Sequence, residues 1–458
     1  MSKREAGSLS LAQKLGYGVG DLGANFCWTF VGSFIMLYCP SVLGISAGVV
    51  GTLIAVSKVL DGITDIFMGQ VIDRTHNKMG KSRFWLFVST FPLAICTYLL
   101  FNVPAYFTEN TKYIYIFIVY TLLGAVFYTM NNIAYSTLMA LCTKNPKDRV
   151  QMGSFRYIFA MVAGILIQYV TVPMVDHFGG GQAGWRAVSL IFSGLCLVIL
   201  MIPVIAVREL PEEELNEGKK ETTEEKMGFF KTLTFLVKNK YFLLILAYYF
   251  FMYLLSFTSS SLTSYYATYV LNNSSAMGTI ALVSYIPTVV VLTFVASLTK
   301  KYGIRRCALL GHCLAFVGGL VCFFGGMFAQ QGLIFVLAGL FIRGLGMAPM
   351  SGSVNALIAA ADDYSQLKTG KRVTGAFFSC SSVGIKVGTG LGTALSGVLI
   401  DLAAVDFNAT VQSAQTISVI KWGYLLPTAL FPLVTVIILS FMDVEDQIAK
   451  LREANSNK

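Results

Sequence analysis

Apolar residues gather in twelve long runs along the chain, and one long polar segment separates the first six runs from the last six. A run of about 20 mostly apolar residues can cross a lipid bilayer as an α-helix. The polar segment, 208–240, is rich in charge and poor in aromatic residues, which is typical of a solvated linker. The pattern predicts an all-α polytopic membrane protein with spans near residues 16–39, 46–71, 84–103, 112–141, 152–175, 187–207, 241–271, 277–298, 306–328, 331–360, 373–402 and 418–442.

The linker divides the chain into two halves of six predicted helices each, which is the layout of many secondary transporters. A weak internal repeat supports the division. The loops 72–83 and 297–306 each place a glycine, Gly80 or Gly303, among basic residues after the second span of a half. We therefore expect an N-terminal six-helix half at 1–207, a cytoplasmic central linker at 208–240, a C-terminal six-helix half at 241–442 and a cytoplasmic tail at 443–458.

Charged residues make up only 13% of the chain, about half of the roughly 25% found in soluble proteins. This excludes a soluble enzyme, a secreted disulfide scaffold and a disordered protein. Of the 34 lysines and arginines, 27 fall in the two termini and in the loops after even-numbered spans. Because basic residues stay on the cytoplasmic side, we expect a multi-pass protein of the cell membrane with both termini in the cytoplasm. The net charge of +10 then reports orientation, and no nucleic-acid partner is expected.

Three charged residues share one face of the second span. Lys58, Asp61 and Asp65 follow one another at spacings of three and four residues, with Thr64 beside them. A charge at the bilayer centre costs about 2.5–3.5 kcal/mol, so such groups need a function or a partner. Two carboxylates and a hydroxyl form an oxygen-rich site that suits Na⁺, or the carboxylates can share a proton, while Lys58 neutralises the empty site. The alternative is a salt bridge that only orders two helices.

Other charged and polar side chains within the spans are candidate substrate ligands. The guanidinium of Arg156, one turn into the fifth span, suits bidentate binding to sugar hydroxyls or to a carboxylate. Alternatively, its side chain extends to the cytoplasmic surface. Arg343 and Lys386 lie deep in the tenth and eleventh spans, so we expect them in a substrate or ion cavity. Asp21 and Asn25, on the first span, belong to the same predicted cavity.

The cytoplasmic end of the fourth span is too polar for contact with lipid. Tyr128 and Asn132 share one helix face there, and Asn131 and Tyr135 share another. Amides and aromatic rings suit a sugar, which offers hydroxyl edges and an apolar face. Hydrogen bonds between helices are the alternative interpretation of the same residues.

Other classes of function lack their sequence signatures. The GKS at 80–82 is not a nucleotide-binding loop, because Thr75 stands where that motif requires glycine. The three histidines are scattered, which argues against a metal-dependent membrane enzyme, and the polar groups do not form the continuous lining of a channel. We therefore expect a transporter rather than an enzyme, with no cofactor beyond a coupling ion. A drug/H⁺ antiporter is the alternative within transporters.

Four segments resemble the glycoside-pentoside-hexuronide:cation symporter family, in the family's order and spacing over roughly residues 14–442. These segments are LGYGVGDLGANF, KVLDGITDIFMGQVIDRTHNKMGKSRFW, YTMNNIAYSTL and ADDYSQLKTGKRVTG. The resemblance implies a major facilitator superfamily fold of 12 transmembrane helices and symport of a sugar with Na⁺, H⁺ or Li⁺. We expect alternating access around a cavity lined by spans 1, 2, 4, 5, 10 and 11, in a protein that functions as a monomer.

The resemblance also implies roles for individual residues. Asp61 and Asp65 match the family's cation-binding carboxylates, and Thr129 matches a threonine of the same site. Arg156 matches an arginine near the sugar, and Lys386 matches a lysine of the eleventh span. Four residues between the tenth and eleventh spans match a cytoplasmic gate: Asp363, Tyr364, Lys368 and Arg372.

Departures from the family pattern narrow the substrate. Asn25 and Asn132 stand where galactoside-transporting members carry acidic residues, and the residue that stacks on galactose falls near Tyr135 or Ser136. The loss of two acidic residues makes the cavity more favourable to an anion. We therefore expect a glucuronide or a hexuronate, with a neutral pentoside or glycoside as the alternative. Thr64 replaces an asparagine of the cation site, so both Na⁺ and H⁺ remain candidates for coupling.

Overall fold

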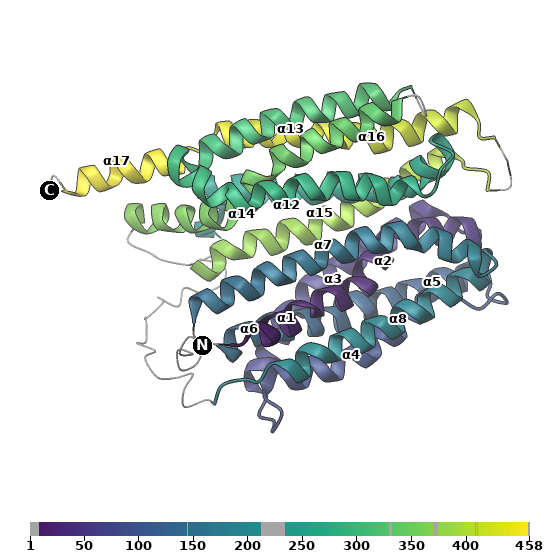
Figure 1. Ribbon diagram of the computed structural model, residues 1–458, viewed down its shortest axis with the longest axis horizontal. Coiled ribbons are helices and arrows are strands. Elements are labelled where there is room, and N and C mark those ends of the chain that lie inside the picture. Colours follow the sequence, from purple (N-terminus) through teal and green to yellow (C-terminus); the bar gives the residue numbers. More distant parts are fainter. Residues whose placement is uncertain are drawn as a thin grey trace. The chain divides into compact units, whose positions relative to one another are not determined.

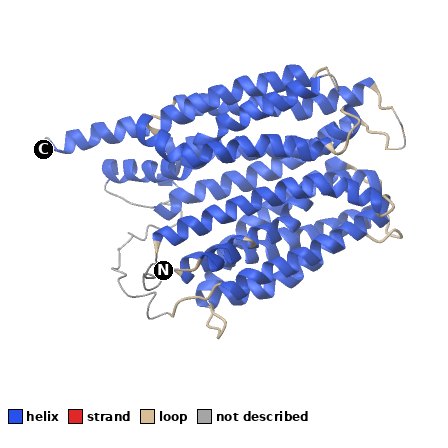
Figure 2. Ribbon diagram, in the orientation of Figure 1, coloured by secondary structure: helices blue, strands red, loops and turns tan. Residues whose placement is uncertain are grey.

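The structure, a computed structural model of the 458-residue chain, describes residues 9–143, 145–211, 234–328, 332–369, 374–407, 409 and 411–456. Every regular element in these residues is a helix, which confirms the predicted all-α class (Figure 1 and Figure 2). Eleven of the described helices are long and apolar enough to cross a membrane. The helix α3 (Ala47–Arg74), with 28 residues, is also long enough. Each of the twelve predicted spans therefore coincides with a helix.

The helices form two compact units, and the first covers the N-terminal part of the chain as far as residue 220. Within it α2 packs against both α7 and α8, and α4 packs against α6 and α8. Its described elements are α1 (Leu11–Gly18), α2 (Gly20–Leu43), α3, α4 (Lys81–Leu100), α5 (Glu109–Thr121), η1 (Leu122–Tyr128), α6 (Thr129–Cys142), α7 (Pro146–His177) and α8 (Gly181–Ala206).

The predicted fourth span is a composite of three consecutive elements. Its middle part, η1, is a π-helix, and α6 begins directly after it at Thr129. A π-helical turn changes the register of a helix locally, and such turns frequently lie at functional sites. The hydrophobic pattern predicted one continuous helix here and gave no sign of this change.

The second unit contains most of the remaining chain and a matching set of long helices. Within it α13 packs against α14 and α16, and α11 packs against α15 and α16. Glycines allow the close approach of α15 to α11, because a Cβ at Gly388 or Gly392 would lie 2.5 or 2.4 Å from a main-chain oxygen of α11. The elements are α11 (Lys240–Tyr265), η2 (Tyr266–Val270), α12 (Ala276–Tyr302), α13 (Ile304–Gly326), α14 (Leu333–Thr369), α15 (Thr374–Ala403), α16 (Ala414–Ser440) and α17 (Val444–Ser456).

Large apolar side chains remain exposed on the outer faces of these helices. Val59, Phe67 and Ile205 in the first unit, and Leu310 and Ile334 in the second, are each more than three-fifths exposed. A water-soluble protein rarely exposes so much apolar surface, whereas lipid tails cover it without cost. The exposure agrees with helices that cross a membrane.

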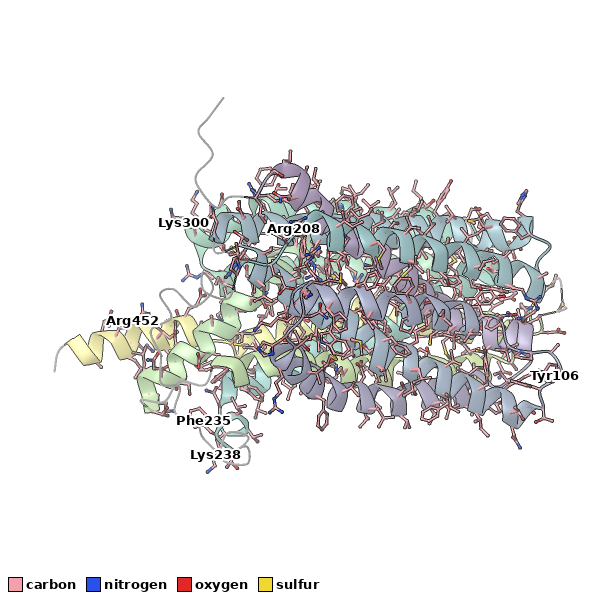
Figure 3. The ribbon with its side chains drawn as sticks, turned by 90° about the horizontal axis from the view of Figure 1, so that it is seen from below. Tyr106, Arg208, Phe235, Lys238, Lys300 and Arg452 are labelled. Atoms are coloured by element: carbon pink, nitrogen blue, oxygen red, sulfur yellow. The ribbon has the colours of Figure 1, made fainter. Side chains whose placement is uncertain are left out.

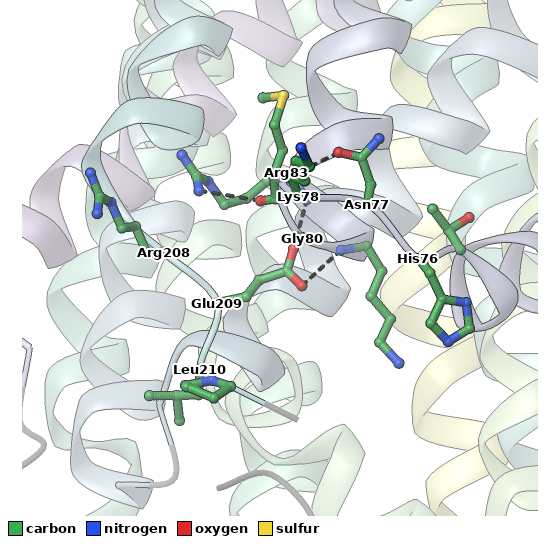
Figure 4. Close-up of a pocket in the computed structure, with 12 residues that line it drawn as sticks. His76, Asn77, Lys78, Gly80, Arg83, Arg208, Glu209 and Leu210 are labelled. Atoms are coloured by element: carbon green, nitrogen blue, oxygen red, sulfur yellow. Dashed lines mark hydrogen bonds between the residues drawn. The ribbon is translucent and has the colours of Figure 1, made fainter. Parts of the chain in front are cut away.

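A glutamate caps the third long helix of the first unit. Glu209, just after α8, accepts hydrogen bonds from the main-chain N–H groups of Lys81, Ser82 and Arg83 at 2.9, 2.8 and 2.8 Å, and its carboxylate points toward Gly80 (Figure 4). In return, Arg83 donates to the main-chain oxygen of Val204 at 2.9 and 2.7 Å, near the end of α8. Each side chain satisfies main-chain groups that a helix end leaves unpaired, and its charge opposes the helix dipole there.

The second unit repeats this arrangement, which we name the carboxylate clasp. Glu445, in the first turn of α17, accepts from the N–H groups of Ile304 and Arg305 at 3.2 and 3.0 Å. Arg305 donates to the main-chain oxygens of Leu439 and Ser440 at 3.3 and 2.7 Å. A glycine with positive φ precedes the capped helix in both clasps: φ is +99° at Gly80 and +84° at Gly303. The loop repeat read from the sequence thus has a structural counterpart, although Glu209 and Glu445 fell in the predicted linker and tail.

The clasp at Glu445 is expected to contribute to the stability of the protein. Glu445→Gln should lower the free energy of unfolding by about 1–2 kcal/mol, because a neutral amide caps a helix N-terminus less strongly than a carboxylate. The neighbouring Asp446→Asn is the matched control. The Asp446 side chain is 68% exposed, and its 3.2 Å ion pair with Arg305 should contribute less than about 1 kcal/mol. Denaturation of the purified protein in detergent measures both, and equal effects would contradict a special role for Glu445.

A buried ion pair holds α1 against α7. Lys14 Nζ lies 2.6 Å from Asp148 Oδ1, and the Leu9 N–H donates to Asp148 Oδ2 at 2.9 Å. Burial raises the pKa of the Asp148 carboxyl, but the hydrogen bonds from Lys14 and Leu9 outweigh it, so the pKa lies below its usual value. A lowered pKa contributes stability that is fully present above the unfolded pKa of about 3.9 and is lost as the pH falls through the lower, folded value.

Asp148→Asn is therefore expected to make the protein less sensitive to acid. The variant should be less stable than the parent at pH 6, and the difference should shrink as the pH is lowered toward about 3. Melting temperatures of both proteins across this range check the prediction. A difference that stays constant with pH would show that the Asp148 carboxylate does not carry the effect.

Candidate functional site

An arginine–aspartate pair joins the first and fifth predicted spans. Arg156 on α7 donates from Nε to Asp21 Oδ2 at 2.6 Å and from Nη2 to Asp21 Oδ1 at 3.3 Å, so the guanidinium holds the carboxylate of α2 with two bonds. The two side chains are only 18% and 17% exposed. Their pairing leaves no net charge in apolar surroundings, where an unpaired ion would cost several kcal/mol.

Two stacked tyrosines support the guanidinium of Arg156. The guanidinium carbon lies 4.3 Å from the centre of the Tyr135 ring, and the Tyr17 ring stacks on the other tyrosine at 4.6 Å. Each tyrosine hydroxyl donates to the main-chain oxygen of the other residue. Arg156 Nη1 also donates to the hydroxyl of Ser136, an exposed residue, at 3.2 Å. The guanidinium is therefore fixed on one side and reaches an open surface on the other.

The second charged centre lies where α3 meets α2 and α6. Asp61 Oδ1 accepts a hydrogen bond from Thr129 Oγ1 at 2.6 Å, and Asp61 Oδ2 lies 3.4 Å from Lys58 Nζ. The Lys58 ammonium also lies 4.0 Å from the centre of the Trp28 ring, within the range of a cation–π interaction. Lys58, Asp61 and Thr129 are all buried. The structure thus brings Thr129 of α6 to the predicted pair of Lys58 and Asp61 on α3.

The oxygen atoms around Asp61 are of the kind that a small cation requires. Hard cations such as Na⁺ are bound by carboxylate, hydroxyl and carbonyl oxygens, which Asp61 and Thr129 supply. The Thr64 hydroxyl donates to the main-chain oxygen of Asp61 at 3.1 Å, and Asp65 lies partly buried one turn further along α3. A proton on the Asp61 carboxylate is the other way to neutralise this charge.

One face of α2 touches both charged centres. Asp21 binds Arg156, and Trp28, two turns later, lies against Lys58 and stacks on Tyr128 at 4.3 Å. Between them, Asn25 donates to the main-chain oxygen of Asp21 and accepts from the Thr29 hydroxyl, both at 2.7 Å. The spacings of four and three residues place these side chains on one helical stripe.

The polar residues of the fourth span divide into two kinds. Asn131 is buried and donates to Ser89 and Thr90 of α4 at 3.0 and 3.2 Å, which is the inter-helix role weighed for this group. Asn132 is exposed on α6 and remains open to a ligand. Tyr135 is buried, and its ring packs against the guanidinium of Arg156. Tyr135 would therefore affect a bound substrate through Arg156 and not by direct contact.

The C-terminal unit holds the remaining predicted residues. Arg343 lies on α14 and Lys386 on α15, both partly exposed. Of the predicted gate residues, Asp363, Tyr364 and Lys368 lie in the last turns of α14, where Lys368 Nζ donates to the Tyr364 hydroxyl at 3.2 Å. Arg372, the fourth gate residue, lies outside the described residues.

Two residues of the site, Tyr17 and Trp28, were not predicted from the sequence. For Tyr17 a signal existed, since it precedes Asp21 by one helical turn on the same face. Trp28 had no such signal, because its contact with Lys58 joins two different helices.

Comparison with known proteins identifies the family. The family model for "MFS/sugar transport protein" matches residues 16–446. The isoprimeverose transporter of Lactiplantibacillus pentosus is 28% identical over 94% of this chain and 88% of its own length. The putative glycoside/cation symporter YagG of Escherichia coli is 26% identical over 97% and 93%, and the glucuronide carrier protein homolog of the same organism is 25% identical over 96% and 94%.

Solved structures agree with the fold. The nucleoside transporter NupG has a TM-score of 0.65 at 14% identity, over 94% of this chain and 99% of the other. A bacterial homolog of the lysosomal transporter Spinster has a TM-score of 0.66 at 14% identity, over 96% and 97%. These findings confirm the predicted major facilitator fold and the resemblance to glycoside-pentoside-hexuronide symporters. The chain belongs to the family of MFS sugar transport proteins, which are multi-pass membrane proteins.

Proposed function

We propose that the protein is a secondary active transporter that couples the entry of Na⁺ or H⁺ to the uptake of a sugar or glycoside by alternating access. The proposal of coupling rests on one face of α2, where Asp21 holds Arg156 and Trp28 contacts Lys58. A rearrangement at either charged centre therefore acts on a helix that the other centre also contacts. The names of the relatives, which include a putative glycoside/cation symporter, support the same function.

The cation in this proposal binds at Asp61, with oxygens from Thr129 and with Asp65 and Thr64 close by. Its positive charge replaces that of Lys58, whose ammonium then moves toward the ring of Trp28. This shifts a contact of α2 and prepares the Arg156 centre for the sugar. By thermodynamic linkage the sugar must raise the affinity for the cation by the same factor.

The sugar in this proposal binds beside Arg156, through the exposed side chains of Asn132 and Ser136 and the partly exposed Asn25. One relative is named as an isoprimeverose transporter and another as a glucuronide carrier homolog, so both neutral and acidic sugars are candidate substrates. We retain a glucuronide or hexuronate as the leading substrate and a neutral pentoside or glycoside as the alternative.

We further propose that a single chain transports in the cell membrane with both termini in the cytoplasm. Figure 3 supports this orientation for each unit taken by itself. In the first unit Arg208 lies at the end opposite Tyr106, and in the second unit Lys238, Lys300 and Arg452 gather at one end. In the same proposal Asp363, Tyr364, Lys368 and Arg372 form the cytoplasmic gate.

A panel of labelled sugars tests the proposed function. Glucuronides, pentosides and galactosides are supplied to proteoliposomes with and without an inward Na⁺ gradient at fixed pH, and then with a pH gradient in the absence of Na⁺. We expect at least one acidic or neutral glycoside to accumulate only when one of the gradients is present. Export of the substrate in exchange for the cation would instead show antiport.

A further inference from the structure

Arg343 has no ionic partner among the described residues, in contrast to Arg156 and Lys58 of the first unit. There, Arg156 pairs with Asp21 and Lys58 pairs with Asp61. The Arg343 side chain forms no hydrogen bond or ion pair with any described residue, and its Nε is buried. A buried donor without an acceptor costs about 1–3 kcal/mol, and more when it is charged. A ligand that supplies the missing acceptor would remove this cost.

The surroundings of Arg343 are neutral and partly open. The titratable side chains close enough to act electrostatically on it include Cys322 and the buried His312 of α13, Tyr424 of α16 and Tyr285 of α12. None of these carries a negative charge at neutral pH. Tyr285 is 39% exposed and Arg343 is partly exposed, so a ligand can reach this face of the unit.

The backbone on both sides of Arg343 is held by neighbouring helices. A Cβ on Gly318 of α13 would lie 2.6 Å from the Arg343 main-chain nitrogen, so α13 packs directly against this turn of α14. On the other side Thr288 of α12 donates to the main-chain oxygen of Gly344 at 2.9 Å. The base of the arginine side chain is therefore fixed, which lowers the entropic cost of binding a ligand.

We propose that Arg343 binds the acid group of a carboxylate-bearing sugar, an inference that rests on the proposed function and specifies its substrate. A guanidinium offers a carboxylate two parallel N–H donors. Arg343 lies ten residues after the first residue of α14, Leu333, hence about 15 Å along the helix, or half of the roughly 30 Å hydrocarbon thickness. At that depth the acceptor is a solute in the transport path rather than a lipid headgroup.

The ion pair of Arg156 with Asp21 explains why the acid group of the sugar would bind to Arg343 and not to Arg156. Its bidentate edge already holds Asp21. A substrate carboxylate at that edge would have to expel Asp21 and leave it unpaired in an apolar site, at a cost of several kcal/mol. Arg156 is therefore left to recognise hydroxyl groups, while Arg343 distinguishes an acidic sugar from a neutral one.

Binding of matched sugars to the purified full-length protein tests this assignment. The probes are p-nitrophenyl β-D-glucuronide and p-nitrophenyl β-D-glucoside, which differ only in the acid group, measured by calorimetry with Na⁺ present. Arg343→Gln should weaken the glucuronide at least about tenfold and the glucoside less than about threefold, as expected for a lost charge-assisted hydrogen bond. Arg343→Lys keeps the charge without the bidentate edge and should give a smaller loss confined to the glucuronide.

Lys421→Gln is the matched control and should change neither affinity. Among the described residues, this lysine of α16 donates to the main-chain oxygen of Met327 at 3.0 Å. Equal weakening of both sugars by Arg343→Gln, or a parent protein that binds the glucoside but not the glucuronide, would overturn the proposal. In either case sugar transport itself would stand. A parent protein for which no sugar is transported with a cation would instead remove the proposed function.

Discussion

Asp61→Asn is expected to abolish cation-driven accumulation of sugar and to leave downhill exchange in place. The substitution removes the negative charge that Thr129 and Lys58 contact at 2.6 and 3.4 Å, so the site loses the carboxylate that holds the cation most strongly. The internal sugar concentration should then reach only about the external one, since a carrier without coupling cannot move a solute uphill. Uptake of a labelled sugar into proteoliposomes under an inward cation gradient, followed by exchange without a gradient, measures both activities.

The single variant removes the Asp61 carboxylate from beside the buried ammonium of Lys58, and breaking a buried ion pair in this way costs about 3–5 kcal/mol in comparable sites and can unfold a protein. The double variant Lys58→Gln/Asp61→Asn removes both charges and controls for this. It should recover stability and sugar exchange but not accumulation. Accumulation equal to that of the parent in the double variant would mean that this pair only orders α3.

The second large effect is expected for Arg156→Gln, which should reduce sugar affinity at least about 100-fold. A site that hydrogen-bonds the hydroxyls of its substrate loses this much when the donor is removed, because the remaining groups are left unpaired. Arg156 also joins the Asp21 carboxylate to the ring of Tyr135, which stacks on Tyr17. Direct binding measurements with the sugar identified in the transport panel give the affinity.

The matched control is Asp21→Asn/Arg156→Gln, in which neither charge is stranded. If Arg156 binds the sugar, this double variant should be as stable as the parent and still bind weakly. If the pair only joins α2 to α7, the double variant should bind sugar with normal affinity. That result would show that the role of Arg156 is structural.

The spans and the charged residues within them could be predicted from the sequence, because each leaves a local pattern. Twenty apolar residues in a row, or Lys58, Asp61 and Asp65 at helical spacing, need no knowledge of the rest of the fold. Asp21 was predicted in the same way as a ligand for the substrate, and that role stays a prediction. Its ion pair with Arg156 depends on how α2 meets α7, which no local pattern shows.

The contacts that could not be predicted all join segments far apart in the chain. Glu209 sits in a charged stretch that reads as linker, and its bonds to Lys81, Ser82 and Arg83 depend on where α8 ends relative to the start of α4. The contact of Trp28 with Lys58 likewise requires α2 and α3 to be packed. The π-helix before Thr129 follows from packing as well, since the residues around it have an ordinary helical pattern.

We propose that a cation bound at Asp61 drives sugar uptake. The most direct test of this proposal is the initial rate and final level of sugar uptake by the parent protein in proteoliposomes, with an inward Na⁺ or H⁺ gradient and again after an ionophore has abolished that gradient. We expect sugar to accumulate above the external concentration with one of the gradients and not to accumulate after the ionophore. Uptake of equal rate and extent with and without the gradient would contradict it.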